Sequence, residues 1–169
     1  MGLIDRIFGR SRESIAAPLY AAIVARGRDP HWFVEGAVPD TIDGRFDMIA
    51  AVLCQVLLRL ERDDAPPELG VALTECFIDD MDAQLRQEGI GDVGLGKQIG
   101  KMVSALGGRL AAYRDGLAAG DLRTALIRNL YRGAPPGDAA VDHVNAALLG
   151  FAAALGATTP AALKEGRLP

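Results

Sequence analysis

Apolar residues recur at helical spacing along most of the chain, and this periodicity restricts the fold more than any other feature. The clearest case is Phe46–Leu60, where the apolar positions follow the 3.6-residue repeat of a helix. Residues that favour strands are too sparse and too scattered to build a large sheet. The sequence therefore predicts an all-α fold, a single-domain bundle of roughly six to eight helices.

Glycine, proline and capping residues divide the chain into these helices. Asp40 and Thr41 can cap a long helix, and Asp92 and Asp138 can cap two later ones. Short loops between the helices indicate neighbouring antiparallel packing. The predicted elements are Ile15–Ala25, a short turn or helix at His31–Gly36, a helix from the Asp40-Thr41 cap to about Arg62, Glu68–Glu88, Asp92 to about Ala119, Leu122–Tyr131, Ala139–Gly156, and a short helix opened by Thr159-Pro160.

Composition excludes several classes of protein. The net charge of −4 argues against specific nucleic-acid binding. Cys54 and Cys76 lie within apolar helical patterns, so we expect two buried thiols and a reducing compartment. No segment has about 18 uninterrupted apolar residues, and Met1–Arg12 has no signal-peptide pattern, so we expect neither a membrane span nor a signal peptide.

Few side chains are placed to carry out chemistry. Gly89–Gly94 spells a dinucleotide-binding pattern, but a charged helix precedes it where a strand is required. Asp79, Asp80 and Asp82 resemble the acidic motif of helical prenyl-diphosphate enzymes, but no second acidic motif faces them. His31 and His143 lie in different elements without ligands at metal-binding spacing. We therefore expect no cofactor, no metal site and no catalytic residue.

Charge and small residues are distributed unevenly. Glu61–Asp92 contains ten acids and two bases, whereas Val93–Gly133 contains seven bases and two acids. Either the two neighbouring helices attract each other, or the basic helix faces an acidic partner or an anionic surface. The basic helix also carries small residues every four positions, which indicates tight packing inside the bundle or docking of a client's transmembrane helix. These are Gly96, Gly100, Ser104, Gly108, Ala112 and Gly116.

The first twelve residues form a separate amphipathic segment, followed by the helical domain at 13–169. On a helix, this segment would have one apolar and one basic face, which suits a weak tether to an anionic membrane. The alternative is a frayed terminus or a cap on the bundle. The tether residues would be Leu3, Ile4, Arg6, Ile7, Phe8 and Arg10.

From about Leu19 to Tyr131, the order and spacing of these pieces resemble the ubiquinol–cytochrome c chaperone family. The resemblance lies in the sequences Leu19–Val24, Val38–Met48 with its Pro39-Asp40-Thr41 helix start, Phe77–Asp82 leading to Gly89-Ile90-Gly91, a basic helix with Lys97, Lys101-Met102 and Gly108–Tyr113, and Ala125–Tyr131.

The resemblance implies an all-helical assembly chaperone, not an enzyme, that binds newly made cytochrome b and assists biogenesis of the cytochrome bc1 complex. It also implies a small partner chaperone or contact with the ribosome. A composition rich in Ala, Gly and Arg, without a transit peptide, resembles a bacterial member, cytoplasmic and peripheral to the inner membrane. The client-binding residues would be Pro39, Asp40, Thr41, Arg45, Phe46, Asp80, Lys97, Lys101, Arg109 and Tyr113.

Two alternatives stay open: a prenyl-diphosphate-type enzyme using Asp79, Asp80 and Asp82, and a helical adaptor with another partner. An enzyme would need a deep pocket lined by these aspartates. A chaperone should instead present a shallow apolar groove or patch rimmed with charge.

Overall fold

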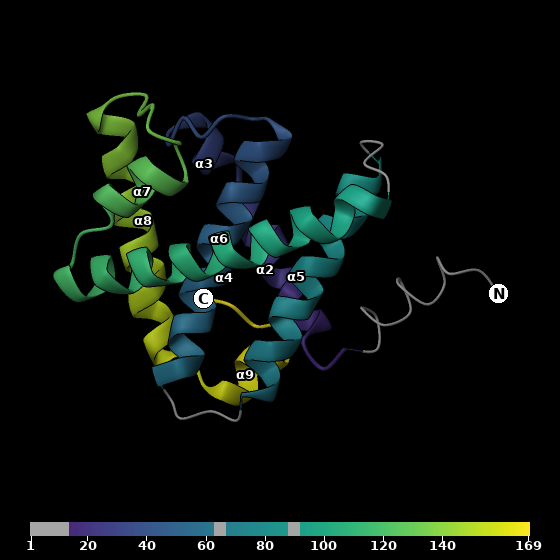
Figure 1. The fold of residues 1–169 in the computed structure, drawn as a ribbon. Helices are drawn as coiled ribbons and strands as arrows, with labels where there is room; N and C mark the ends of the chain where they lie inside the picture. The colour runs from purple at the N-terminus through teal and green to yellow at the C-terminus, as the bar shows by residue number, and fades with distance from the viewer. Residues whose placement is uncertain (1–13, 63–66, 88–91) are drawn as a thin grey trace.

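A computed structural model describes residues 14–62, 67–87 and 92–169, and within these ranges the only regular secondary structure is helical (Figure 1). The predicted all-α bundle is confirmed. The proposed tether residues of the N-terminal segment lie outside the described residues. The helices are α2 (Ala17–Gly27), α3 (Pro30–Val34), α4 (Ile42–Arg62), α5 (Glu68–Gln87), α6 (Asp92–Ala119), α7 (Arg123–Asn129), α8 (Asp138–Ala157) and α9 (Pro160–Lys164).

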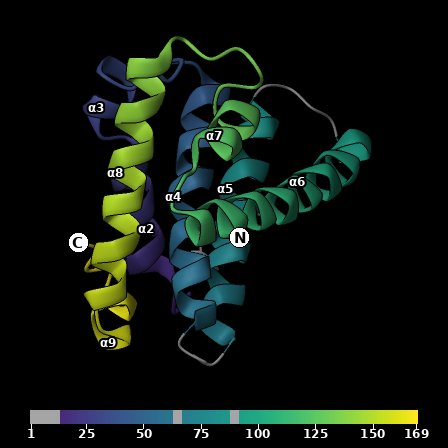
Figure 2. The same cartoon turned by 90° about the vertical axis from the view of Figure 1, so that its left-hand side faces the viewer.

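Helix α4 is the centre of the bundle. It is buried almost continuously from Asp47 to Leu58, because α2, α6 and α8 pack against different sides of it. Helix α6 runs across α4 in Figure 1, and the view in Figure 2 shows it extending away from the neighbouring α4 and α8. Helix α6 therefore packs on α4, and α5 and α7 also contact it.

The start of α4 depends on two small features of the loop before it. The Thr41 Oγ1 accepts a hydrogen bond from the Gly44 backbone N–H at 3.1 Å, so the predicted capping role of Thr41 is confirmed. A Cβ atom added at Gly44 would lie 1.9 Å from the Pro39 carbonyl oxygen. The loop thus folds back onto the first turn of the helix at a distance that only glycine allows.

Two further predicted caps have different outcomes. Thr159 caps α9, since its Oγ1 accepts a hydrogen bond from the Ala162 N–H at 3.2 Å. The predicted capping role of Asp138 is wrong, because Asp138 is already the first residue of α8. The preceding position is Gly137, whose φ of 144° is easily reached only by glycine.

The last helix packs back onto the first described one. Leu163 of α9 is completely buried, and a Cβ atom at Gly166 would lie 2.6 Å from the Pro18 carbonyl oxygen. The Arg26 guanidinium donates to the Pro169 carbonyl oxygen. Helices α2 and α9 therefore cover each other at one end of the bundle.

Both cysteines behave as predicted. Cys54 on α4 and Cys76 on α5 are free and buried, and burial raises the pKa of the Cys54 thiol to about 12. One described helix, α8, is long and apolar enough to cross a membrane, as are many core helices of water-soluble bundles. One side of α8 contributes five apolar side chains to the core: Val141, Val144, Leu148, Phe151 and Leu155.

Candidate functional site

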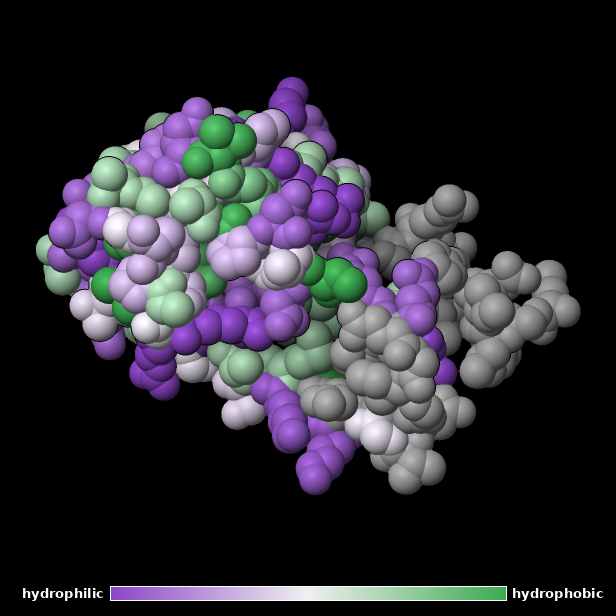
Figure 3. Space-filling model, turned by 90° about the horizontal axis from the view of Figure 1, so that it is seen from above, coloured by the Kyte–Doolittle hydropathy of each residue, from purple (hydrophilic) through white to green (hydrophobic). Residues whose placement is uncertain are grey.

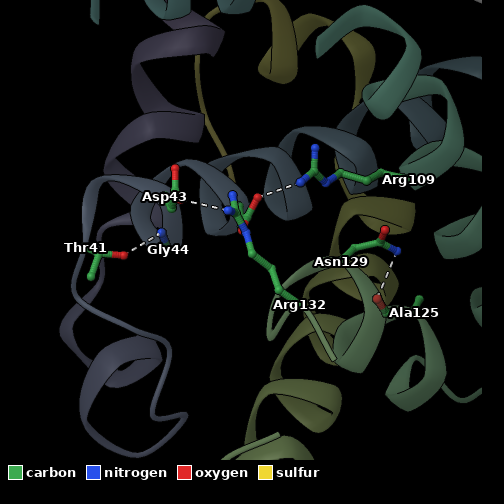
Figure 4. Close-up of polar contacts among 8 residues, drawn as sticks. Thr41, Asp43, Gly44, Arg109, Ala125, Asn129 and Arg132 are labelled. Atoms are coloured by element: carbon green, nitrogen blue, oxygen red, sulfur yellow. Dashed lines mark hydrogen bonds and ion pairs between the residues drawn. The ribbon is translucent and has the colours of Figure 1, made fainter. Parts of the chain in front are cut away.

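The most unusual polar feature of the bundle is a buried carboxylate on its central helix. Asp47 is 1% exposed and accepts hydrogen bonds from two arginines, Arg109 of α6 at 2.6 Å and Arg132 at 2.7 Å. Arg132 also donates to Asp43 at 2.7 Å, so its guanidinium bridges two turns of α4 (Figure 4). These contacts tie α6 and the segment after α7 to α4.

Burial dominates the electrostatics of this cluster. Removal from water raises the pKa of Asp47, and the two guanidinium groups partly offset that effect. The pKa of Arg132 is raised chiefly by its hydrogen bond to Asp47. The Arg109 Nε is buried without a hydrogen-bond partner among the described residues, and the guanidinium lies 5.3 Å from the centre of the Phe46 ring. Arg109 and Phe46, both predicted to bind the client, are thus also part of the protein's own packing.

The predicted client residues before and at the start of α4 are accessible. Pro39, Asp40, Thr41 and Arg45 are all exposed. Arg45 donates from Nε to Asp40 at 2.7 Å, and this hydrogen bond lowers the pKa of Asp40. An exposed pair of this kind contributes little to stability, so both side chains are available to another protein.

The acidic cluster on α5 is engaged within the bundle. The Tyr20 hydroxyl donates to Asp80 at 2.7 Å, and Arg86 forms an ion pair with Asp82 at 2.9 Å. Asp80 therefore links α5 to α2. No group of three or more candidate metal ligands occurs within the part of the chain that the structure describes.

The bases after Val93 fall into two groups. Arg109 and Arg114 of α6 pair with acids of α4, Asp47 and Glu61, at 2.6 and 2.7 Å. These two pairs join α6 to α4, whereas the predicted attraction was toward the acidic helix that directly precedes α6. By contrast, Lys97 is exposed and makes no ion pair with any residue that the structure describes. The same is true of Lys101 and Arg128.

The small-residue stripe on α6 likewise contains one closely packed glycine and several glycines that face open space. Gly116 packs tightly, since an added Cβ would lie 2.9 Å from Leu122. A Cβ at Gly96, Gly100 or Gly108 would meet no atom within 4 Å. The interpretation of the stripe as tight internal packing is therefore wrong for Gly96, Gly100 and Gly108, which face open space.

Two clefts border α6. The basic cleft has a volume of about 580 Å³, and the apolar cleft, between α4, α5 and α6, has a volume of about 420 Å³. The apolar cleft is lined by Leu57, Leu60, Val71 and Leu110, and the acidic residues Glu61 and Glu75 also line it. Seen from above, the hydrophobic residues form small patches separated by hydrophilic ones (Figure 3). The basic cleft is lined by Gly100, Lys101, Ser104, Ala105, Gly108, Arg109, Arg128, Asn129 and Arg132.

Comparisons with known proteins identify the relatives of this chain. Residues 35–168 match the family described as ubiquinol-cytochrome C chaperone. The chain belongs to the ubiquinol–cytochrome c chaperone family. The crystal structure of the Cbp3 homolog from Brucella abortus superposes on it with a TM-score of 0.78 at 30% identity, covering 98% of this chain and 93% of that one. No curated protein sequence matches the chain.

Membership in this family supports a role in assembly of the bc1 complex. The chaperone also has the shallow, charge-rimmed apolar groove expected of a client-binding protein, in the form of the apolar cleft. Neither of the two clefts is lined by Asp79, Asp80 or Asp82.

One residue of the predicted client surface of this chaperone is not at the surface. Tyr113 is completely buried on α6, and burial raises the pKa of its hydroxyl, which has no hydrogen-bond partner in residues 14–62, 67–87 and 92–169. In this conformation Tyr113 packs in the core and cannot touch a client. The exposed members of the set are Pro39, Asp40, Thr41, Arg45, Lys97 and Lys101.

Sequence reasoning missed a histidine pair in this chaperone. The Nδ1 of His31 on α3 lies 2.9 Å from the Nε2 of His143 on α8, and the rings meet edge to face. Burial and the neighbouring His143 lower the pKa of His31. One imidazole ring can therefore donate a hydrogen bond to the other only while at least one of the two rings is neutral.

Proposed function

We propose that this chaperone binds newly made cytochrome b through the first half of α6 and thereby assists assembly of the bc1 complex in a bacterium. The observation that carries the proposal is that four residues of this stretch make no ion pair or close packing contact with the part of the chain that the structure describes. Lys97 and Lys101 have no ion pair with the described residues, and Gly96 and Gly100 have no neighbour within 4 Å of an added Cβ.

The glycines argue for a helical partner. Each glycine inside a helix costs about 0.5–1 kcal/mol relative to alanine, and at Gly96 and Gly100 no internal contact offsets that cost. Small residues at four-residue spacing let another helix approach the backbone closely. Val103, 44% exposed, adds an apolar contact on the same helix. This combination suits a transmembrane helix of a membrane-protein client.

Two neighbouring features extend the proposed surface. The apolar cleft can receive an apolar side chain of the client beside Val71, which is 55% exposed. The exposed loop Pro39–Thr41 adds polar contacts at the start of α4. Since cytochrome b is a membrane protein, we further propose that this chaperone acts at the cytoplasmic side of the inner membrane.

The test uses a double variant, Gly96→Leu with Lys97→Glu, which blocks close approach and reverses one charge without touching either cleft. We expect an unchanged or slightly raised melting temperature, since leucine is a better helix former than glycine. Capture of cytochrome b and bc1 levels in membranes should fall several-fold.

The matched control is Gly150→Leu, at a glycine of α8 that also has no neighbour within 4 Å of an added Cβ. It should leave bc1 levels unchanged. Normal bc1 levels in the α6 double variant would contradict the proposal and shift attention to the exposed loop before α4.

A further inference from the structure

The basic cleft has the composition of an anion site. Its α6 wall contributes Lys101 and Arg109, and its other wall contributes Arg128 of α7 and Arg132 just after it. Four cations thus converge on one hollow from two elements that are distant in sequence. Like charges so arranged raise the local concentration of anions and destabilise an empty site.

Internal pairing cancels only part of this charge. Asp47 and Asp43 accept hydrogen bonds from Arg109 and Arg132 and neutralise two of the four cations. Lys101 and Arg128 are exposed and have no ion pair with any described residue, so the cleft keeps a net charge of two positive units.

The cleft also holds free hydrogen-bond donors. Arg132 uses Nε and Nη1 internally, which leaves its Nη2 hydrogens unused in the contacts with Asp43 and Asp47. Asn129 donates to the Ala125 carbonyl oxygen at 3.0 Å, and its amide carries a second N–H. Ser104 supplies a hydroxyl. More donors converge here than the two oxygens of a carboxylate can accept.

The α6 wall lets a ligand come close to the helix. A Cβ at Gly100 or Gly108 would meet no atom within 4 Å, so open space reaches the α6 backbone at both positions. The volume of about 580 Å³ lies within the range of about 300–1,000 Å³ typical of small-molecule sites, and exceeds what a bare ion fills. The site therefore has room for an esterified group beside the anion.

We propose that the basic cleft binds a phosphate group, held by Arg128, Lys101 and the free donors of Arg132. Arginine forks match the geometry of phosphate oxygens, and a phosphate ester carries one to two negative charges, which balances the two uncompensated cations. The phosphate belongs either to a phospholipid headgroup or to a small soluble ester. This site shares Gly100 and Lys101 with the client surface proposed above, but it extends to Arg128 and Arg132 and does not depend on the identity of the client.

The binding test uses the full chain labelled with ¹⁵N, titrated with glycerol phosphate to millimolar concentrations. The expected result is that backbone amide shifts concentrate at Gly100, Ser104, Gly108 and Asn129. Arg128→Gln and Lys101→Gln should each weaken binding at least tenfold, while Lys97→Gln, an equally exposed lysine of α6 outside the cleft, should not. Absence of binding, or binding unaffected by Arg128→Gln, would overturn the proposal.

A second arm identifies the source of the phosphate. Vesicles of phosphatidylglycerol in phosphatidylcholine are sedimented with the protein, beside vesicles of phosphatidylcholine alone. If the protein sediments with the anionic vesicles and the Arg128→Gln variant does not, the site binds a lipid headgroup. Binding of glycerol phosphate without sedimentation assigns it to a soluble ester. Because Gly96→Leu with Lys97→Glu leaves the cleft intact, failure of the client proposal and failure of this one are separable.

Discussion

Arg132 donates from Nε to Asp47 at 2.7 Å, across 85 residues of sequence, from a backbone with a φ of 51°. A left-handed conformation is uncommon for a residue other than glycine, and here it directs the side chain back toward α4. The Tyr131 hydroxyl, one residue earlier, donates to the Gly36 carbonyl oxygen at 2.6 Å. Together these bonds fasten the segment after α7 to the start of the loop that precedes α4 and to α4 itself.

Removing the carboxylate of Asp47 should destabilise the protein strongly. Asp47→Ala leaves the guanidinium of Arg109, 12% exposed, without its partner, and we expect a loss of about 3 kcal/mol in the free energy of unfolding. Urea unfolding should show a lower midpoint with an unchanged slope. Asp40→Ala, which removes an exposed pair with Arg45, is the control and should leave the midpoint in place. Equal midpoints for both variants would show that the buried cluster is not stabilising.

Stability should fall on mild acidification because of the histidine pair. The pKa of His31 is lower in the folded protein than its ordinary value of 6.5, so the unfolded chain takes up the proton more readily. The free energy of unfolding should therefore decrease as the pH falls from 7.5 through 6.5 to 5.5. His143→Gln should flatten this dependence in thermal melts across that range. The prediction fails if the variant and the unchanged protein show the same slope.

Two glycine substitutions should have opposite effects. Gly44→Ala would place a methyl group against the Pro39 carbonyl, and we expect a loss of about 1–3 kcal/mol as the loop shifts. Gly107→Ala adds a methyl group where nothing lies within 4 Å, and better helix propensity should raise stability by about 0.5–1 kcal/mol. Differential scanning calorimetry of both proteins tests the pair. A stabilised Gly44→Ala variant would mean that the loop before α4 is not held close to the helix.

The acidic residues of α5 should not bind magnesium. Asp80 accepts a hydrogen bond from the Tyr20 hydroxyl, and Asp82 is paired with Arg86, so each of these acids already has a partner within the bundle. Isothermal titration with magnesium and a prenyl diphosphate should show no binding. Micromolar affinity that disappears in Asp80→Ala would revive the enzyme alternative.

The positions of the helices could be predicted because local chemistry determines them. Helix α4 begins directly after the Pro39–Thr41 segment, where Thr41 caps it. Helix α9 begins at Thr159-Pro160, as expected from capping and proline placement. The burial of α4 also follows from its apolar pattern. Periodicity did not show which side of α6 would be covered, since small residues suit both a packed face and an open one.

The polar contacts could be predicted only in part. Asp47 lies one turn before Ala51 and two turns before Cys54, both buried, so its position alone indicates a buried acid that needs a base. Nothing local identifies Arg109 and Arg132 among the bases of the chain as its partners. The contact between His31 and His143, 112 residues apart, depends entirely on how α3 meets α8.

The packing of α9 on α2 bears on how the protein is made. Helix α2 leaves the ribosome early, but the side of it that α9 covers has no native partner until nearly the whole domain has been synthesised. Pro18, which meets Gly166, and Arg26, which donates to the Pro169 carbonyl oxygen, lack these partners during that interval. The final step of folding of this chaperone is therefore late and long-range, and it should be slow compared with formation of its individual helices.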